Sequence, residues 1–594
     1  MVNNNEINQI LKEFSFGDKN KAYNNLKKIF DKNRSNYKLQ FNLAVIQHSL
    51  GKYEDAKENY KILIGKKKDR KVIINLFTIY LLQENYNEAL DLINILYVEN
   101  IESVAVAKEK AFVLYKLKKY DESTSICFSI LKKNKSNVDI INIIGFNYFE
   151  KQNFKESEKF FKKTLRIEPN NIVALNAIGR LYHEQRDTVN AEKYLLKAYK
   201  LKRDSYEIIN NLANHYKEIL KYKKAIVLYT KALKYDKKNP TILNNLAKTY
   251  FDISDLDKAE YYCKKALMLS NDDNIKMILS LIYLKKQKYS KAWKYFDGRI
   301  SSENFAKKNI LIGKIREKAN DKKNLNQDSK ILILREQGIG DELLYGTMYK
   351  DIFRLWKNVT IECDKRLINL FKNSFKENKE QFVKLGSISE NSSALSKYDF
   401  VFYSGSLGQY VRNNINNFKS GIYLKADEYL VTKSIDLLKK SKKKYNIGIS
   451  WKSFNNRYTK EKSLSLNEVI NLLKNKDYNF INLQYGDVSK EIYNINKKLN
   501  NKISLVKDLD IFNDFDYLSG VLKSIDLFIS VSNSTAHLAG ALGVKTLLIK
   551  PESNAIFHYW NQKNERTPWY SSVKLVTKNT FLKNKNLVED FLNF

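Results

Sequence analysis

The sequence predicts an α + α/β protein, in which an N-terminal α-helical repeat array precedes a parallel α/β region. Small and aromatic residues recur with a period of 34 in the first half of the chain. Twelve of the 19 glycines lie after residue 337, where short β-branched runs alternate with helical stretches. Hydrophobic residues make up 43% of the 594 residues and aromatic residues 13%, which is enough apolar surface for packed structure.

The repeat signal is clearest between about residues 137 and 297. A small residue lets two antiparallel helices approach closely, and large residues nearby fill the groove beside it. Weaker copies continue the pattern on both sides, which gives about nine units across residues 3–300. The recurring small residues are Gly145, Gly179, Ala213 and Ala247, and each is followed three residues later by Tyr148, Tyr182, Tyr216 or Tyr250.

This pattern resembles the tetratricopeptide repeat (TPR). The resemblance implies an α-solenoid over residues 1–313, whose concave surface holds extended peptide segments. A Lys-rich stretch, residues 314–329, is the predicted linker to the second half. His48, His183 and His215 lie inside the array without Cys or carboxylate partners at metal-ligand spacing, so we expect no metal site there.

The formal net charge of +38 raises the question of a polyanionic partner. The lysines are spread along the whole chain and accompany abundant Asn, Ile and Tyr, so a solvated basic surface is the favoured interpretation over a nucleic-acid groove. We therefore expect no nucleic-acid partner. Peripheral contact with acidic lipids stays open, although no amphipathic anchor helix supports it.

Compartment signals predict a cytoplasmic protein. No apolar run approaches the ~18 residues that a membrane helix needs, so no transmembrane segment is expected. The first residues lack the basic and apolar blocks of a secretion signal. Cys127, Cys263 and Cys363 are odd in number and widely spaced, which argues against a disulfide framework.

The second half predicts two Rossmann-like lobes that face each other. Alternation of buried strands with helices is typical of parallel sheets, whose loops at the strand carboxyl ends surround a cleft. A break near residues 437–445 separates a first lobe, residues 330–435, from a second lobe, residues 445–594. The predicted strands are 331–334, 359–362, 400–403, 447–450, 480–484, 527–531 and 546–549.

The first segment with candidate chemistry follows strand 331–334. Gly338 and Gly340 permit a tight turn, and Asp341 stands where the next helix begins. Asp341 is either a helix N-cap or a cleft-facing carboxylate that accepts a proton from an attacking hydroxyl.

Two further loops carry candidate phosphate contacts. Lys452 and Arg457 follow strand 447–450, where they are either plain surface residues or cations that neutralise a diphosphate. Ser532, Asn533, Ser534 and Thr535 follow strand 527–531 and lead into a helix that contains His537. They either cap that helix or form an anion site at its start, and their density favours the anion site.

Residues 329–580 resemble the heptosyltransferase-like glycosyltransferases (glycosyltransferase family nine), including bacterial members with N-terminal TPRs. The segment GxGD is matched by Gly338, Gly340 and Asp341, and GxSW by Gly448, Ser450 and Trp451. Leu483, Gln484, Gly486 and Asp487 match an LQxGD-like segment, and His537–Gly543 matches HLAGALG. The exit from the repeats, with Trp293, Tyr295 and Arg299, resembles the segment that joins repeats to catalytic domain in these fusions.

The resemblance implies a GT-B fold and an inverting, metal-independent sugar transfer with no cofactor besides a nucleotide-sugar donor. Asp341 is then the general base. Lys452, Arg457, Gln484 and the turn 532–535 belong to the donor side, with His537 nearby. Many relatives have Asp where this chain has Ser532, and the first lobe is short. The nucleotide and the acceptor therefore stay open.

The predicted function is a hexosyl- or related glycosyltransferase whose TPR array recruits a protein or a surface-glycan precursor. The architecture is also similar to that of the O-linked N-acetylglucosamine transferase, whose signatures match these residues less well. The alternative is a non-catalytic TPR scaffold with an inactive nucleotide-sugar-binding domain.

Overall fold

The computed structural model describes residues 4–99, 103–301, 324–336, 338–439, 441, 443–453, 462–473, 477–498, 502–551, 558–560, 565–584 and 586–593. The chain divides into two compact units, Met1–Tyr235 and Asp236–Phe594. No helix in this described part of the chain is long and apolar enough to cross a membrane. Most of the predicted linker, residues 314–323, lies outside the described residues.

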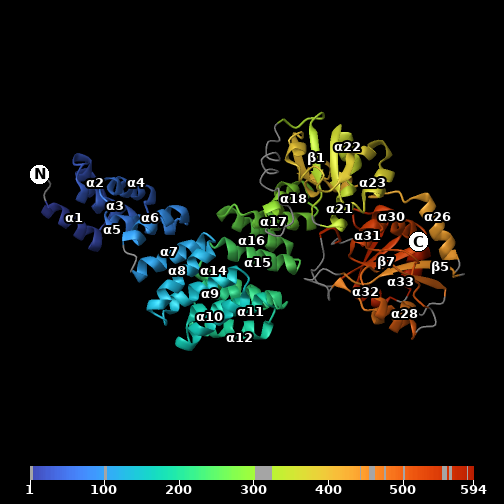
Figure 1. Cartoon of the computed structure of the whole chain (residues 1–594), viewed down its shortest axis with the longest axis horizontal. Coiled ribbons are helices and arrows are strands. Elements are labelled where there is room, and N and C mark those ends of the chain that lie inside the picture. The colour runs from blue at the N-terminus through green and yellow to red at the C-terminus, as the bar shows by residue number, and fades with distance from the viewer. Residues whose placement is uncertain are drawn as a thin grey trace. The chain divides into compact units, whose positions relative to one another are not determined.

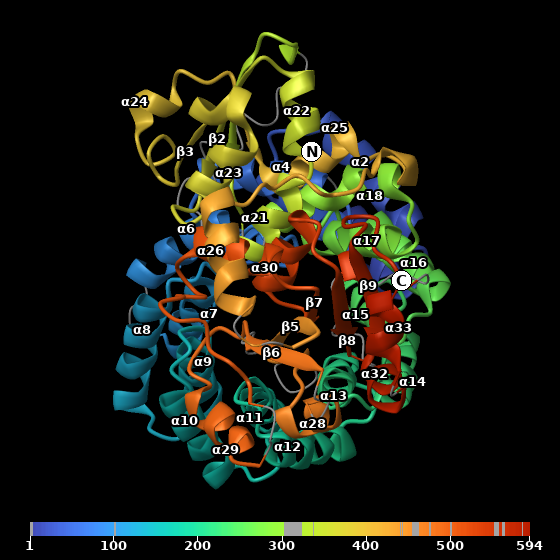
Figure 2. The same ribbon diagram turned by 90° about the vertical axis from the view of Figure 1, so that its right-hand side faces the viewer.

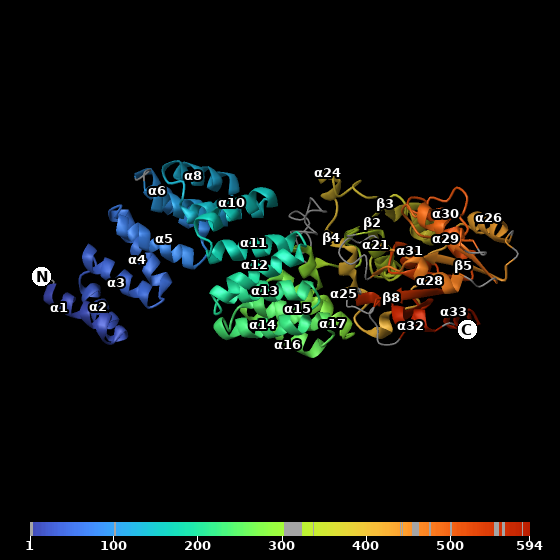
Figure 3. The same cartoon turned by 90° about the horizontal axis from the view of Figure 1, so that it is seen from below.

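Eighteen α-helices before residue 297 form nine successive hairpins within the described residues, as the period of 34 predicts (Figures 1 and 3). Helices α1–α14 belong to the first unit and α15–α18 to the second. Their bounds are α1 (Asn4–Phe16), α2 (Lys19–Lys32), α3 (Tyr37–Ser49), α4 (Tyr53–Lys66), α5 (Arg70–Leu82), α6 (Tyr86–Glu99), α7 (Val104–Lys116), α8 (Tyr120–Lys133), α9 (Val138–Glu150), α10 (Phe154–Ile167), α11 (Ile172–Glu184), α12 (Thr188–Leu201), α13 (Tyr206–Glu218), α14 (Tyr222–Tyr235), α15 (Pro240–Asp252), α16 (Leu256–Leu269), α17 (Asp273–Lys285) and α18 (Tyr289–Phe296).

Polar caps start the first helix of each central hairpin at the repeat spacing. The side chains of Asn137, Asn171, Ser205 and Asn239 each accept a hydrogen bond from the amide three residues on. Each cap satisfies one of the four amides that a helix start leaves without an intrahelical partner. The repeat period therefore sets the helix starts as well as the core.

The predicted small residues sit where the two helices of a hairpin approach. A methyl group added to Gly145 would lie 2.6 Å from the Phe161 ring, and one added to Gly179 would lie 2.6 Å from Cγ of Leu195. Phe161 and Leu195 are fully buried. The close approach inferred from the sequence is confirmed at both repeats.

In eight of the nine hairpins among the described residues, the turn uses a left-handed backbone conformation that the sequence pattern does not predict. Gly51 has a φ of 73°, but the equivalent turns place ordinary residues there. Such a conformation costs a residue with a Cβ roughly 1–2 kcal/mol. These residues are Glu84, Lys118, Gln152, Arg186, Leu220, Ser254 and Gln287, with φ between 56° and 62°.

A four-stranded parallel sheet, in the order β3-β2-β1-β4, forms the first lobe of the C-terminal unit. Ile331 of β1 lies opposite Val359 of β2 and Phe400 of β4. The strands are β1 (Lys330–Leu334), β2 (Asn358–Cys363), β3 (Phe382–Lys384) and β4 (Phe400–Tyr403). The three predicted strands are confirmed, whereas the three-residue β3 was missed because so short a run carries no readable periodicity.

A five-stranded parallel sheet, in the order β6-β5-β7-β8-β9, forms the second lobe (Figure 2). Its strands are β5 (Tyr445–Ser450), β6 (Tyr478–Asn482), β7 (Leu527–Val531), β8 (Thr546–Lys550) and β9 (Val573–Thr577). The four predicted strands are present, with β6 ending two residues earlier than expected. β9 was not predicted.

The remaining elements of the C-terminal unit cover and connect the two sheets. The predicted first-lobe boundary at residue 435 cuts α26, which packs against α30 beside the second sheet. These remaining elements are η1 (Asp297–Ser301), α21 (Ile339–Gly346), α22 (Tyr349–Leu355), α23 (Ile368–Ser374), η3 (Lys376–Gln381), α24 (Ser392–Leu395), η4 (Ser404–Leu407), α25 (Gly408–Val411), η5 (Ile415–Asn417), α26 (Glu428–Lys439), α28 (Leu466–Leu473), α29 (Ser489–Asn496), α30 (Phe515–Lys523), α31 (Ser534–Ala541), η6 (His558–Trp560), α32 (Lys578–Lys583) and α33 (Leu587–Asn593).

The last hairpin of the array packs against the loops of the first lobe. The indole N–H of Trp293 donates to the carbonyl of Arg412 at 2.8 Å, and the rings of Tyr289 and Phe418 lie 4.7 Å apart. A methyl group on Gly408 would lie 2.5 Å from the Trp293 indole, so only a glycine leaves room for it. The C-terminal unit therefore begins inside the predicted solenoid 1–313.

Candidate functional site

Two of the sequence-predicted site segments meet at the starts of helices α21 and α31. Gly340 in the first turn of α21 lies against α31: an added methyl group would be 3.2 Å from Cδ2 of His537 and 3.7 Å from Cα of Ser534. α21 follows the first strand of the first lobe, and α31 follows β7 of the second lobe. The two lobes thus contact each other through the predicted GxGD segment and the turn 532–535 with the helix that follows it.

Asp341 lies at the third position of α21 and is half-buried. The residue before the helix is Gly338, so the alternative interpretation of Asp341 as an N-cap is wrong. Burial raises the pKa of the Tyr559 and Tyr570 phenols, and the charge of Asp341 raises both further. Because that charge acts on two second-lobe side chains, Asp341 lies close to the second lobe.

The turn after β7 is held by hydrogen bonds of its own side chains. Asn533 is the N-cap of α31, and its Oδ1 accepts the amide of Ala536 at 3.0 Å. The hydroxyl of Ser532 accepts the indole N–H of Trp560 at 3.0 Å. Asn533 and Thr535 are buried, whereas Ser532 and Ser534 are half-buried. Ser532 and Ser534 are thus the members of this turn with partly accessible surface.

A buried hydrogen-bond network joins that turn to the ends of β5 and β6. The Asn533 amide donates to the Ser450 hydroxyl at 2.8 Å, and that hydroxyl donates to Oε1 of Gln484 at 3.0 Å. The same oxygen accepts the amides of Trp451 at 2.8 Å and Lys452 at 2.6 Å. The network fixes three strand ends of one sheet relative to one another.

The Gln484 carboxamide forms hydrogen bonds within the second lobe. Its side chain is 1% exposed, and its Nε2 donates to the carbonyl of Tyr485 at 2.8 Å. The carboxamide is therefore used within the protein. Gln484 positions the loop after β5, and its contact with a substrate stays a prediction.

The two predicted basic residues have different outcomes. The Lys452 ammonium forms an ion pair with Glu491 of α29, and the two side chains are 35% and 26% exposed. Arg457 falls in residues 454–461, outside the described residues. A diphosphate contact by Lys452 would require this ion pair to open, and it stays a prediction.

His537 is enclosed by aromatic side chains that the sequence reasoning missed. Its ring centroid lies 5.1 Å from that of Tyr559, 4.8 Å from Trp560 and 5.8 Å from Tyr570. Nδ1 lies 3.2 Å from the Tyr570 hydroxyl, and the side chain is 3% exposed. Burial lowers the pKa of His537 to about 3. His537 is therefore neutral at physiological pH and supplies hydrogen bonding and shape, not positive charge.

Ionisable side chains from other segments surround Glu342, the buried residue that follows Asp341 in α21. Burial raises the pKa of Glu342 to about 7, and its Oε1 accepts the amide of Asp364 at 2.9 Å. Although burial acts in the opposite direction, hydrogen bonds from Arg366 and Arg335 hold the pKa of Asp364 well below its usual range. Arg366 also donates to the carbonyl of Phe512 at 3.0 Å, which ties the first lobe to the second.

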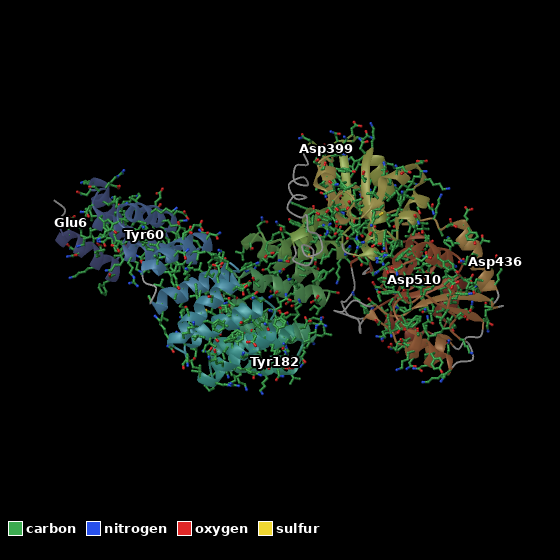
Figure 4. The ribbon with its side chains drawn as sticks, viewed as in Figure 1. Glu6, Tyr60, Tyr182, Asp399, Asp436 and Asp510 are labelled. Atoms are coloured by element: carbon green, nitrogen blue, oxygen red, sulfur yellow. The ribbon has the colours of Figure 1, made fainter. Side chains whose placement is uncertain are left out.

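A cavity in the second lobe opens at the end of β6. Its volume is about 550 Å³, and its wall includes Gln484, Tyr485, Phe512 and the polar loop 508–510. Asp510, marked in Figure 4, also borders a neighbouring cavity of about 410 Å³ that Lys365 and Arg366 reach from the first lobe. Both cavities are of the size that small-molecule sites have.

Within the described residues, no group of three or more His, Cys, Asp or Glu side chains is arranged to hold a metal ion. The three cysteines are buried and unpaired. Burial raises the pKa of the Cys127 and Cys263 thiols to about 12, so neither is an activated nucleophile.

Comparison with known proteins identifies the repeats. A tetratricopeptide-repeat family model matches residues 37–63, 172–205 and 240–273, and a second TPR model matches residues 221–253. The chain is therefore a protein with an N-terminal TPR solenoid, followed by a part with two parallel sheets. TPR arrays are protein-interaction scaffolds.

One curated relative is protein FlbA of Caulobacter vibrioides, which is 26% identical over 258 residues. The match covers 41% of this chain and 42% of FlbA, so the chain spans less than half of that relative's length. A TPR protein of Parabacteroides merdae is similar in structure, with 18% identity over 41% of this chain and 98% of that chain and a TM-score of 0.37. The structure described as Pseudomonas aeruginosa pilF shows 15% identity over 33% and 91%, with a TM-score of 0.30.

Proposed function

We propose that the C-terminal unit is an inverting, metal-independent glycosyltransferase, which moves a sugar from a nucleotide-sugar donor to an acceptor recruited by the TPR array. The observation that carries the proposal is the contact between α21 and α31. Gly340, the neighbour of the candidate general base Asp341, lies against Ser534 and His537 in this contact. This is the arrangement that the resemblance to family nine implies.

The donor is expected to bind along the strand ends of the second lobe. The start of α31 directs amides and a partial positive charge toward any anion placed before it. The hydroxyls of Ser532 and Ser534 are half-buried at this point, and a diphosphate there would accept hydrogen bonds from both. The cavity of about 550 Å³ at the end of β6 leaves room for the nucleoside.

The transfer itself is a substitution at the anomeric carbon. The acceptor hydroxyl loses its proton to Asp341 and forms the new C–O bond, while the bond to the diphosphate breaks and the nucleoside diphosphate keeps its electrons. A general base of this kind contributes roughly 10²–10⁴-fold. Loss of one donor to the departing diphosphate would cost about 3 kcal/mol of transition-state stabilisation.

Acceptor capture is assigned to the repeats. Helices α11 and α13 of the first unit border a cavity of about 280 Å³. Its wall carries both charges and two amides, namely Arg180, Glu184, Asn211, Asn214 and Lys217 among others. Carboxamides and paired charges can hydrogen-bond to an extended backbone, so the proposed acceptor carries a peptide segment.

The alternative function, a non-catalytic scaffold, is favoured by one specific observation. The Lys452 ammonium is paired with Glu491, and His537 is uncharged, so neither supplies an available cation at the second-lobe strand ends. A domain that binds a nucleotide sugar without turnover needs less charge at the leaving group than a transferase does.

The test is donor binding followed by turnover. Thermal shifts of the full chain with UDP-, GDP-, ADP- and CMP-sugars should single out one nucleotide, because a ligand bound at 100 times its Kd stabilises the fold by about 2.7 kcal/mol. With that donor, Asp341→Asn should lose at least 100-fold in kcat while its donor affinity stays within about two-fold.

Asp436→Asn is the matched control, since Asp436 is an exposed carboxylate on α26 of the same unit. It should leave both binding and turnover unchanged. A donor that binds the wild-type chain without any hydrolysis or transfer would establish the scaffold function. Full turnover in Asp341→Asn would remove Asp341 from the reaction.

A further inference from the structure

The residue that ends the repeat array, Arg299, is buried in the first lobe. It lies in η1, directly after the last helix of the array, and its side chain is 4% exposed. Nε and one terminal nitrogen donate to the two oxygens of Glu336, both at 2.8 Å. The remaining N–H groups donate to the carbonyl of Phe296, to Asp297 and to the hydroxyl of Ser406, each at 3.0 Å. All five donors of the guanidinium therefore have partners.

Glu336 belongs to the loop that carries the candidate base. It stands two residues after β1 and two residues before Gly338, the N-cap of α21. Its carboxylate accepts hydrogen bonds from the amide of Gly405, in η4 after β4, and from the Arg299 guanidinium. A methyl group on Gly405 would meet Oε1 of Glu336, so a larger residue here would displace the carboxylate. The carboxylate is 5% exposed and joins three separate chain segments.

A buried bidentate pair with all its partners in place holds geometry more than it adds stability. Desolvation of the two charges offsets most of their attraction, and such pairs are retained where a register must be kept. Here the register concerns the turn between β1 and α21, in which Glu336 stands five residues before Asp341. The same repeat hairpin is fixed a second time, by the hydrogen bond from Trp293 to the carbonyl of Arg412.

We propose that Arg299 is a positioning residue, which fixes the loop of Asp341 through Glu336 and so makes the last TPR hairpin a part of the site. Arg299 does not touch the reacting atoms. It acts by fixing the carboxylate of Glu336, a residue of the turn between β1 and α21. The consequence for transfer rests on the proposed function of Asp341, whereas the consequence for the loop does not.

The first measurement is hydrogen exchange of the full chain without substrate, followed at the amides of residues 342–346 in α21. Arg299→Lys keeps the charge but loses the two-pronged geometry, and Glu336→Gln removes the carboxylate. Both should raise exchange of these amides at least ten-fold. Trp293→Phe is the matched control, because it loosens the same hairpin without touching Glu336, and it should change them by less than three-fold.

The second measurement separates positioning from general stability. In Arg299→Lys, kcat should fall at least ten-fold while the donor KM stays within two-fold, since a displaced base affects the chemical step and leaves donor binding intact. Should Arg299→Lys fail to fold, Ser406→Ala removes a single hydrogen bond of the guanidinium. It should then raise α21 exchange about three-fold or more.

Unchanged α21 exchange in the folded variants would overturn the proposal. Equal increases in Trp293→Phe and Arg299→Lys would also overturn it, because docking in general would then be the cause. A wild-type chain that transfers no sugar from any donor would reject the proposed function instead, and the exchange result would still decide whether Arg299 holds the loop.

Discussion

Lowering the pH from 7.5 to 5 should destabilise the C-terminal unit through His537. The side chain is 3% exposed, and burial lowers its pKa to about 3 from an ordinary value of 6.5. In the unfolded chain, His537 takes up a proton below pH 6.5, whereas in the folded protein it stays neutral until about pH 3. The unfolded state therefore binds more protons in this window, and the free energy of unfolding falls as the pH falls.

The magnitude follows from the two pKa values. A pH of 5 lies 1.5 units below the pKa of His537 in the unfolded chain, and each unit corresponds to about 1.36 kcal/mol. Protonation of His537 should therefore lower the free energy of unfolding by about 2 kcal/mol. This figure is an upper bound, because a small local opening would hydrate the imidazolium. His558 also has a pKa lowered to about 3 by burial, and it contributes to the total in the same direction.

The assay is urea unfolding of the full chain at pH 7.5 and pH 5, followed by tryptophan fluorescence. All five tryptophans lie between residues 293 and 569, so the signal reports only the C-terminal unit. Trp560 lies 4.8 Å from the His537 ring and is fully buried. The comparison variant is His537→Gln, which cannot gain the proton, while His558 is present in both proteins and cancels.

Wild type should lose about 2 kcal/mol more than His537→Gln between the two pH values. The same pH dependence in both proteins would refute the reasoning, because it would mean that His537 is solvated or already charged in the fold. A neutral His537 would then no longer be part of the description of the site.

Three further predictions concern packing, ionisation and backbone strain. Gly340→Ala should destabilise the C-terminal unit by about 1 kcal/mol in urea unfolding and weaken donor binding, since the added methyl group meets the enclosed His537 at 3.2 Å. The control is Gly65→Ala, where the added methyl group has nothing within 4 Å, and it should be neutral or stabilising. Glu342 keeps its proton in the folded protein up to about pH 7 but loses it near pH 4.5 in the unfolded chain. The free energy of unfolding should therefore fall by at most about 3 kcal/mol between pH 4.5 and 7. The same fall in Glu342→Gln would contradict the raised pKa of Glu342. Leu220→Gly should raise the stability of the first unit by about 1 kcal/mol over Leu220→Ala in thermal unfolding, because only glycine relieves the strain of a φ of 61°.

Side-chain periodicity made the repeat array predictable from the sequence. Gly145 and Gly179 recur at the same position of successive hairpins, and each contact that they make is local to one hairpin. Because the pattern recurs nine times, it stays recognisable even where single residues are unusual, such as Leu220, a non-glycine turn residue with a φ of 61°. The left-handed conformation of that turn could not be predicted from the sequence, because the two helices that the turn joins impose it, and not the turn's own side chain.

The α/β part was predictable in its strands but only partly in its site. β1, β4 and β7 were recognised because each is a short apolar run next to a turn, which is local information. The contact of Gly340 with His537 joins residues almost 200 positions apart, and only the placement of two lobes could reveal it. The resemblance to family nine pointed to both segments without saying that they touch.

The repeat class, the parallel strands and the segments in which candidate chemistry is concentrated were predictable from residue spacing, because each depends on local patterns along the chain. The partners of the polar side chains became evident only in the folded protein. It paired Lys452 with Glu491, engaged the Gln484 carboxamide with the Ser450 hydroxyl and with backbone groups, enclosed His537 among three aromatic rings and buried Arg299 against Glu336. Charge state and hydrogen-bond partners depend on burial and on neighbours brought from other parts of the chain, and neither is encoded in local spacing.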